Sequence, residues 1–226
     1  MQPAVKVAIA TGLFAVEHSA LASRCAKSVA SVKFPQGRKL YRVTYNAQAV
    51  LTFGALVWYV SRQPAVTIYR VRGAAAAAMR VGQFAGVAFA AAAAHATGIA
   101  TLAGLEALHG RQEPAAQGPE AGDAGELRVT GPFKLVRHPL NLAPLAPFWL
   151  APHMTTRRLA FNVVATAYLI AGSLHEEARL RSQYGDAYAR YQSSGVPFYF
   201  PRLRTSITST ATTDTSPSST ARPARP

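Results

Sequence analysis

The stretch VGQFAGVAFAAAAAHATGIATLAGL, at residues 81–105, is the longest part of the chain without an acidic residue, a lysine or an arginine. Its 25 residues match the roughly 17 to 25 that a helix needs to cross a bilayer. Three further apolar runs, at 7–22, 45–60 and 159–174, approach that length, and the first is interrupted by Glu17. The four runs together predict an all-α fold, an integral membrane helical bundle.

A fifth apolar segment, 140–152, has 13 residues and contains three prolines. As a helix it would cover only about 20 Å, so we expect a short, kinked or partial span. Residues 153–158 separate it from the run at 159–174, which predicts a helical hairpin that turns there. The complete prediction is a bundle of about five spans that ends in this hairpin.

The basic residues lie between the apolar runs. The net charge is +14, from 24 Lys and Arg against 10 Asp and Glu, although 50% of the residues are hydrophobic. With the N-terminus outside, residues 23–42, 106–139 and those after 174 share the cytoplasmic side and hold 17 of the 24 bases. This follows the positive-inside rule, although the outer loop at 61–80 keeps four arginines. A nucleic-acid-binding domain would explain the charge but not the apolar runs.

Composition divides the chain into three expected parts. Residues 1–105 are predicted to form N-terminal transmembrane helices, and residues 106–204 a C-terminal domain that carries the motifs described below. Residues 205–226 are a low-complexity Ser/Thr/Pro/Ala tail that we expect to be disordered. Within 81–105, Gly82 and Gly86 begin a row of small residues spaced by four, which favours close helix packing.

Two short motifs in the C-terminal part have side chains suited to ligand binding. Arg137-His138-Pro139 stands before the predicted hairpin, and Glu176-Glu177 follows it. Pro139 is favoured in a first helical turn, where free N–H groups attract anions, and Arg137 is a fork-shaped donor for a carboxylate. Closure of the hairpin would bring the motifs together, as a match for a ligand with a carboxylate and a positive centre. The alternative is that Arg137 snorkels to the interface and Glu176-Glu177 begin a solvated helix.

A longer pattern surrounds these motifs and resembles the isoprenylcysteine carboxyl methyltransferase and phospholipid methyltransferase superfamily. That superfamily is characterised by R-H-P-x-Y, a hairpin, E-E and a downstream Tyr- and Pro-containing pattern. The matching residues here are Arg137-His138-Pro139, Glu176-Glu177, Leu180, Tyr184-Gly185-Asp186, Tyr188, Tyr191, Val196-Pro197 and Pro201. The segment from Trp149 to Tyr168 is most similar to the bacterial methanethiol S-methyltransferase branch, and the N-terminal part is similar to that branch and to NnrU-type membrane proteins.

The resemblance implies S-adenosylmethionine as the methyl donor, bound on the cytoplasmic side within the C-terminal hairpin domain. Arg137 and Glu177 would be catalytic. The implied cofactor-binding residues are Leu127, Phe133, Arg137, His138, Pro139, Asn141, Glu176 and Glu177. The implied location is a bacterial inner membrane, where the protein would be multi-pass, with a small-molecule or lipid methyl acceptor and no nucleic-acid partner.

Asn141 is a departure, because it stands where the family motif has a tyrosine. Loss of an aromatic wall would weaken cofactor binding, reshape the acceptor pocket or mark a branch without methyl transfer. A small thiol, a prenylcysteine-like carboxylate and a lipid stay open as acceptors. The alternative function is a non-catalytic, NnrU-type multi-pass membrane protein.

Ionisable residues within the apolar runs are further candidates. Glu17 and His18 are candidates to assist deprotonation of a neutral acceptor, although an interfacial position in contact with water is the simpler interpretation. His95 is expected to be a hydrogen-bonded packing residue, and the histidines have no metal-ligand spacing. Ala20-Leu21-Ala22 resembles a signal-peptide cleavage site, but Glu17 and His18 are unusual in such a segment.

Overall fold

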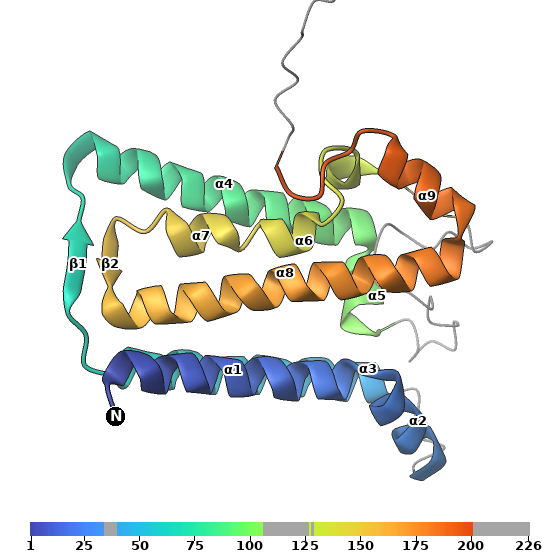
Figure 1. The fold of residues 1–226 in the computed structure, drawn as a ribbon, viewed down its shortest axis with the longest axis horizontal. Coiled ribbons are helices and arrows are strands. Elements are labelled where there is room, and N and C mark those ends of the chain that lie inside the picture. The colour runs from blue at the N-terminus through green and yellow to red at the C-terminus, as the bar shows by residue number, and fades with distance from the viewer. Residues whose placement is uncertain (34–39, 106–126, 128, 201–226) are drawn as a thin grey trace, which may run out of the picture.

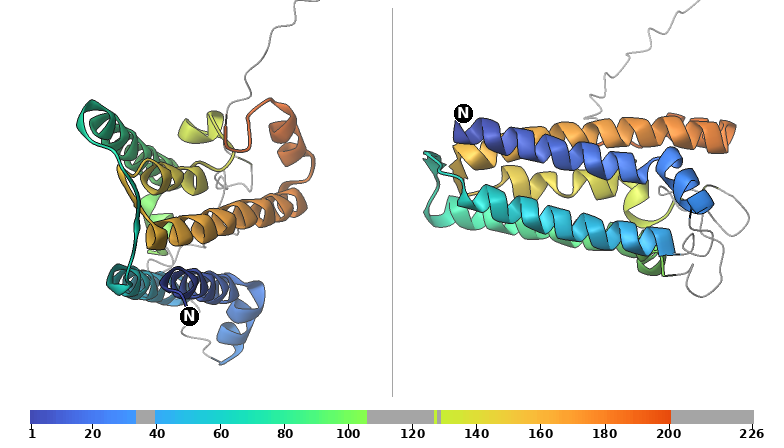
Figure 2. Two further views of the ribbon diagram at one scale, coloured as in Figure 1. Left: turned by 60° about the vertical axis from the view of Figure 1, so that its left-hand side comes forward. Right: turned by 90° about the horizontal axis from the view of Figure 1, so that it is seen from below.

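The computed structural model describes residues 1–33, 40–105, 127 and 129–200. Four long helices lie lengthwise beside one another (Figure 1). They are α1 (Pro3–Ala22), α3 (Tyr41–Arg62), α4 (Gly73–Thr97) and α8 (Thr156–Tyr184). α8 is central, because α1 and α3 pack on one side of it, and the short helices α6 (Pro139–Leu142) and α7 (Leu145–Trp149) lie between it and α4 (Figure 2).

Shorter elements close the two ends of this bundle. At one end, β1 (Thr67–Arg70) pairs antiparallel with β2 (His153–Thr155). The elements at the opposite end are α2 (Arg24–Lys33), α5 (Ile99–Ala103), the 3-10 helix η3 (Gly131–Lys134) and α9 (Asp186–Ser193) (Figure 1). The described parts of the segments after α1, before α6 and after α8 therefore lie at one end, as predicted.

The bounds of α4 differ from the predicted ones. The helix begins at Gly73 and ends before Gly98, so it contains Arg80 and excludes the last part of the charge-free stretch. Arg80 is accommodated because its position on the helix is exposed. Gly98 ends the helix with φ of 91°, a left-handed conformation that favours glycine, and α5 begins directly after it.

Two helices of the described residues, α1 and α4, are long and apolar enough to cross a membrane. A bundle of five spans is not confirmed. α6 and α7 are short and broken, as the prolines predict, and the second half of α8 carries many charged residues. Many of the large apolar residues on α1 and α4 also point outward: Val5, Ile9, Leu13, Val16, Val81, Phe84 and Val87 are all exposed. Such stripes suit contact with lipid and indicate membrane association.

Gly82 and Gly86 of α4 allow α7 and the residue after it to approach closely. A Cβ on Gly86 would lie 2.6 Å from the Cβ of Ala146, and one on Gly82 would meet the side chain of Leu150. The small residues therefore serve packing within the molecule, as predicted.

The predicted turn at 153–158 is wrong in detail, because β2 occupies its first half and α8 begins at Thr156. The Thr155 hydroxyl caps α8 by accepting a hydrogen bond from the Arg158 N–H at 3.4 Å. The Arg157 guanidinium donates to the carbonyls of Ser61 and Gln63, each at 2.8 Å, and so ties the start of α8 to the end of α3.

Candidate functional site

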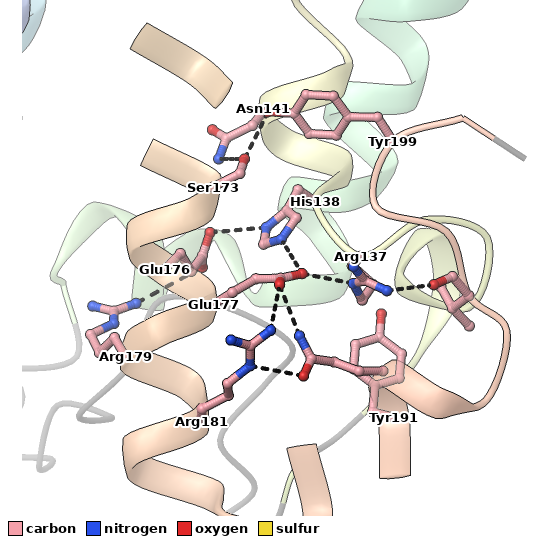
Figure 3. Close-up of polar contacts among 12 residues, drawn as sticks. Arg137, His138, Asn141, Ser173, Glu176, Glu177, Arg179, Arg181, Tyr191 and Tyr199 are labelled. Carbon is pink, nitrogen blue, oxygen red and sulfur yellow. Dashed lines mark hydrogen bonds and ion pairs between the residues drawn. The ribbon is translucent and has the colours of Figure 1, made fainter. Parts of the chain in front are cut away.

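The Arg137-His138 and Glu176-Glu177 pairs contact each other at the end of the bundle that carries α9 (Figure 3). The first pair precedes α6, and the second lies in the second half of α8. A third segment, 196–199, follows α9 and passes over both. The predicted meeting of the two motifs is therefore present in the structure.

Arg137 makes contacts with both of the other segments. Its Nε donates to Glu177 Oε1 at 2.7 Å, and its Nη1 donates to the Val196 carbonyl at 3.0 Å. Its backbone N–H donates to the Pro197 carbonyl at 2.9 Å, and its guanidinium lies 5.7 Å from the ring centre of Phe198. The side chain is only 15% exposed, so this arginine does not simply reach water.

His138 is buried between the two carboxylates. Its Nε2 lies 3.2 Å from Glu177 Oε1, and its Nδ1 lies 3.4 Å from Glu176 Oε2. A doubly protonated imidazole donates to both carboxylates, whereas a neutral one donates to one of them. The ring of Phe198 lies 4.8 Å from the His138 ring, centre to centre.

Glu177 is the most connected residue of the site. Its Oε1 accepts from Arg137 and His138, and its Oε2 accepts from Gln192 at 2.8 Å and from Arg181 at 3.4 Å. Glu176 is more accessible, with a side chain that is 21% exposed and an Oε1 that lies 3.8 Å from Arg179. The site therefore holds one buried and one accessible carboxylate.

Pro139 opens α6, as predicted, but α6 has only four residues. A helix of one turn has little of the dipole on which an N-terminal anion site depends, because that dipole is a sum over many peptide units. The Arg137 side chain is therefore a better candidate than the helix terminus for contact with an anionic ligand group.

An open groove of about 840 Å³ lies beside this cluster. Val196, whose carbonyl bonds to Arg137, and Tyr191 line the groove. Leu127 lines the groove, whereas Phe133 is buried and its carbonyl accepts a hydrogen bond from the Tyr191 hydroxyl at 2.6 Å. The other lining residues are Val129, Lys134, Gln183, Tyr184, Ala187, Arg190 and Ser194. The groove thus combines apolar side chains with tyrosines, other polar groups and two cationic side chains.

Three tyrosines that follow Glu177 lie at or next to the groove: Tyr184 and Tyr191 line it, and Tyr188 packs against Tyr191. Tyr188 and Tyr191 are buried with Leu180, and burial is the largest cause that raises the pKa of both tyrosines. Within the described residues, the hydroxyls of Tyr184 and Tyr188 are buried without a hydrogen-bond partner. Such hydroxyls are costly unless a ligand or water satisfies them.

Comparisons with known proteins identify relatives of this chain. It is 36% identical to a methanethiol S-methyltransferase of Pseudomonas deceptionensis over 80 residues. This aligned segment covers 35% of this chain and 30% of the relative. It is 41% identical over 71 residues to methanethiol S-methyltransferase 2 of Bradyrhizobium diazoefficiens, or 31% of this chain and 27% of the relative. About a third of the chain is therefore similar in sequence to methanethiol S-methyltransferases.

A methanethiol S-methyltransferase of Mycobacterium tuberculosis is also similar, with 37% identity over 60 residues, or 26% of this chain and 25% of the relative. These matches span less than a third of the length of the curated relatives. No family model and no solved structure matches the chain. The methanethiol S-methyltransferases belong to the isoprenylcysteine methyltransferase-like superfamily, which agrees with the resemblance drawn from the motifs.

The C-terminal segment contributes contacts that the motifs did not predict. Val196, Phe198 and Tyr199 all touch the cluster, and Tyr199 also bonds to Ser173. Val196-Pro197 was visible as a methyltransferase-family motif, but its contact with Arg137 was not. Gln192 was also missed, because a glutamine on an exposed helix gives no signal of its own.

The remaining candidates lie elsewhere. His18 Nε2 lies 2.7 Å from the Tyr45 hydroxyl, on the side of α8 that faces α1 and α3, and the exposed Glu17 accepts from Gln48 at 2.6 Å. His95 is exposed in the last turn of α4, so its predicted packing role is wrong. In the described part of the chain, no group of three or more His, Cys, Asp or Glu residues is arranged to hold a metal.

Proposed function

We propose that the chain is a membrane methyltransferase that binds S-adenosylmethionine at the Arg137–Glu177 cluster and methylates a small thiol. The observation that carries this proposal is the contact between Arg137-His138 and Glu176-Glu177, 38 to 40 residues apart, beside an open groove. The homologues named methanethiol S-methyltransferase support the thiol as acceptor. A prenylcysteine-like carboxylate and a lipid are the alternatives.

The residues present fit the parts of this donor. Its sulfonium and ammonium groups are cationic and its carboxylate is anionic, so Glu176 suits the former and Arg137 the latter. Leu127 and Val196 give the groove an apolar surface for a nucleoside. The Tyr184 hydroxyl, which has no hydrogen-bond partner among the described residues, is available to bond to a polar group of the donor. The volume of about 840 Å³ lies within the range of small-molecule sites.

The protein's own task in such a reaction is placement and exclusion of water. When bound, the donor supplies a methyl group already activated by positive charge on its sulfur. The buried carboxylate of Glu177 fixes Arg137 and His138, so the polar surface offered to the donor is held in place before binding. Glu176, the more exposed carboxylate, is the group available to face the donor's positive charge.

The site lies at the end of the bundle where the basic segments gather, so we place it at the cytoplasmic face. We propose that Leu127 contacts the cofactor as part of the groove wall. Pro139 would contribute as the first residue of α6, and Asn141 through its hydrogen bond to Ser173 of α8. Phe133 acts through its carbonyl bond to Tyr191, because its side chain is buried.

Titration calorimetry of the purified full chain in detergent with S-adenosylmethionine tests the proposal. We expect saturable binding by the wild type, and at least a tenfold loss in Arg137→Ala and in Glu176→Gln. Arg70→Ala, an exposed arginine on β1 at the other end of the bundle, is the matched control and should bind normally. Absence of binding by a folded wild type overturns the enzyme assignment in favour of the non-catalytic, NnrU-type alternative.

A further inference from the structure

A buried chain of hydrogen bonds lies one helical turn deeper than the carboxylates (Figure 3). Asn141 Nδ2 donates to Ser173 Oγ at 2.8 Å, and Ser173 Oγ lies 2.7 Å from the Tyr199 hydroxyl. The Tyr199 hydroxyl donates to the Leu169 carbonyl at 3.0 Å, so the Ser173 hydroxyl is the donor to Tyr199. Ser173 is fully buried and Tyr199 is 6% exposed.

This chain joins the same three segments that form the site. Asn141 follows His138 by three residues, and Ser173 precedes Glu176 by three and Glu177 by four, which places Ser173 and Glu177 on one face of α8. Tyr199 belongs to the segment that passes over Arg137. Its ring meets the ring of His138 nearly edge-on, with centres 6.2 Å apart.

α6 depends on such contacts for its position. An isolated helix of a single turn is unstable, so α6 cannot hold His138 in place by its own hydrogen bonds. The side-chain contacts of α6 with α8 therefore determine where the imidazole lies relative to the two carboxylates. Tyr199 closes this contact because it bonds to α8 at both Ser173 and Leu169.

We propose that Tyr199 is a positioning residue, which through Ser173 and Asn141 sets the placement of α6 on α8 and thereby holds His138 between Glu176 and Glu177. The consequence for donor binding rests on the proposed function, whereas the placement of His138 does not. Among the described residues, the Tyr199 hydroxyl bonds to Ser173 and Leu169 and has no hydrogen bond to either carboxylate.

The test compares Tyr199→Phe with Tyr168→Phe. Both substitutions remove one hydroxyl, but Tyr168 bonds to Ser19 at 3.2 Å on the α1 side of α8, away from His138. Two readouts are taken on the full chain in detergent: the imidazole NMR signals of His138, assigned with His138→Gln, and the Kd for S-adenosylmethionine. Tyr199→Phe removes the hydrogen bonds to both Ser173 and Leu169. We expect it to shift the His138 signals and to weaken binding about 3- to 10-fold, because the loss reaches the donor only through other groups.

Tyr168→Phe should leave both readouts unchanged. If Tyr199→Phe lowers thermal stability but leaves the His138 signals unchanged, its role is merely structural and the inference is wrong. Shifted His138 signals in a chain that binds no S-adenosylmethionine would support the positioning role and overturn the proposed function instead. Where Tyr199→Phe fails to fold, Ser173→Ala removes the same contact from the other side and must give the same shift.

Discussion

Two arginines share the carboxylate of Glu177, and we predict very different effects when each is replaced by alanine. Arg137 approaches Oε1 at 2.7 Å and is 15% exposed, whereas Arg181 approaches Oε2 at 3.4 Å and is 60% exposed. Removing one partner of a buried ion pair costs about 3 to 5 kcal/mol, and exposed pairs contribute about 0 to 1 kcal/mol. Because His138 and Gln192 still bond to Glu177 in Arg137→Ala, we expect the lower limit, about 3 kcal/mol.

For a chain of this length, 3 kcal/mol corresponds to a fall in Tm of roughly 6 to 12 °C, against about 4 °C or less for Arg181→Ala. Thermal unfolding in one detergent, followed by circular dichroism, measures both variants without any ligand. Equal shifts for the two arginines would contradict the assignment of Arg137–Glu177 as the more buried pair at the centre of the site.

Three further predictions concern packing, pH and the far end of the bundle. Gly86→Ala should destabilise the protein by about 1 to 3 kcal/mol, because the new Cβ would lie 2.6 Å from that of Ala146. Gly172→Ala on α8 places its Cβ in open space and should be neutral or slightly stabilising. Equal Tm values for the two variants would refute the α4–α7 contact. Burial raises the pKa of Tyr188 and Tyr191 above the ordinary 10.0, so their contribution to stability is complete below pH 10 and is lost as the pH rises further. The difference in tyrosinate absorbance between the wild type and Tyr188→Phe or Tyr191→Phe should therefore develop only as the protein unfolds, and a difference that develops near pH 10 in the folded protein would contradict this. Arg157→Ala should lower the free energy of unfolding in urea by about 1 to 2 kcal/mol, because two carbonyls at the end of α3 lose their donor. The affinity for S-adenosylmethionine should stay unchanged, and weaker binding would contradict the separation of the two ends of the bundle.

The helical architecture could be predicted from the sequence because lipid-facing and buried helices both need long apolar runs. The bounds of α4 could not, because an exposed position on the helix tolerates Arg80 and the apolar residues after Gly98 belong to another helix. The pairing of β1 with β2 was also missed. A four-residue strand whose partner lies more than 80 residues away has no periodicity that a local pattern can reveal.

The site shows the same division between motif and contact. Arg137, His138, Glu176 and Glu177 were predictable because their residue types and order match a family pattern. Tyr199 was not, because its importance arises from an irregular segment that folds back over α6 and bonds to Ser173 and Leu169. Asn141, which stood out as a departure from the pattern, takes part in that same contact through Ser173.

Methyl transfer itself tests the central claim most directly. The purified full chain is given S-adenosylmethionine labelled in its methyl group, together with methanethiol, a prenylcysteine analogue or a phospholipid amine, and the labelled product of each is counted. We predict transfer to methanethiol that exceeds transfer to the other two and is lost in Glu176→Gln while Arg70→Ala retains it. A wild-type chain that is folded and binds the donor, yet transfers no label to any of the three acceptors, would contradict the proposal that this homologue of methanethiol S-methyltransferases is an enzyme.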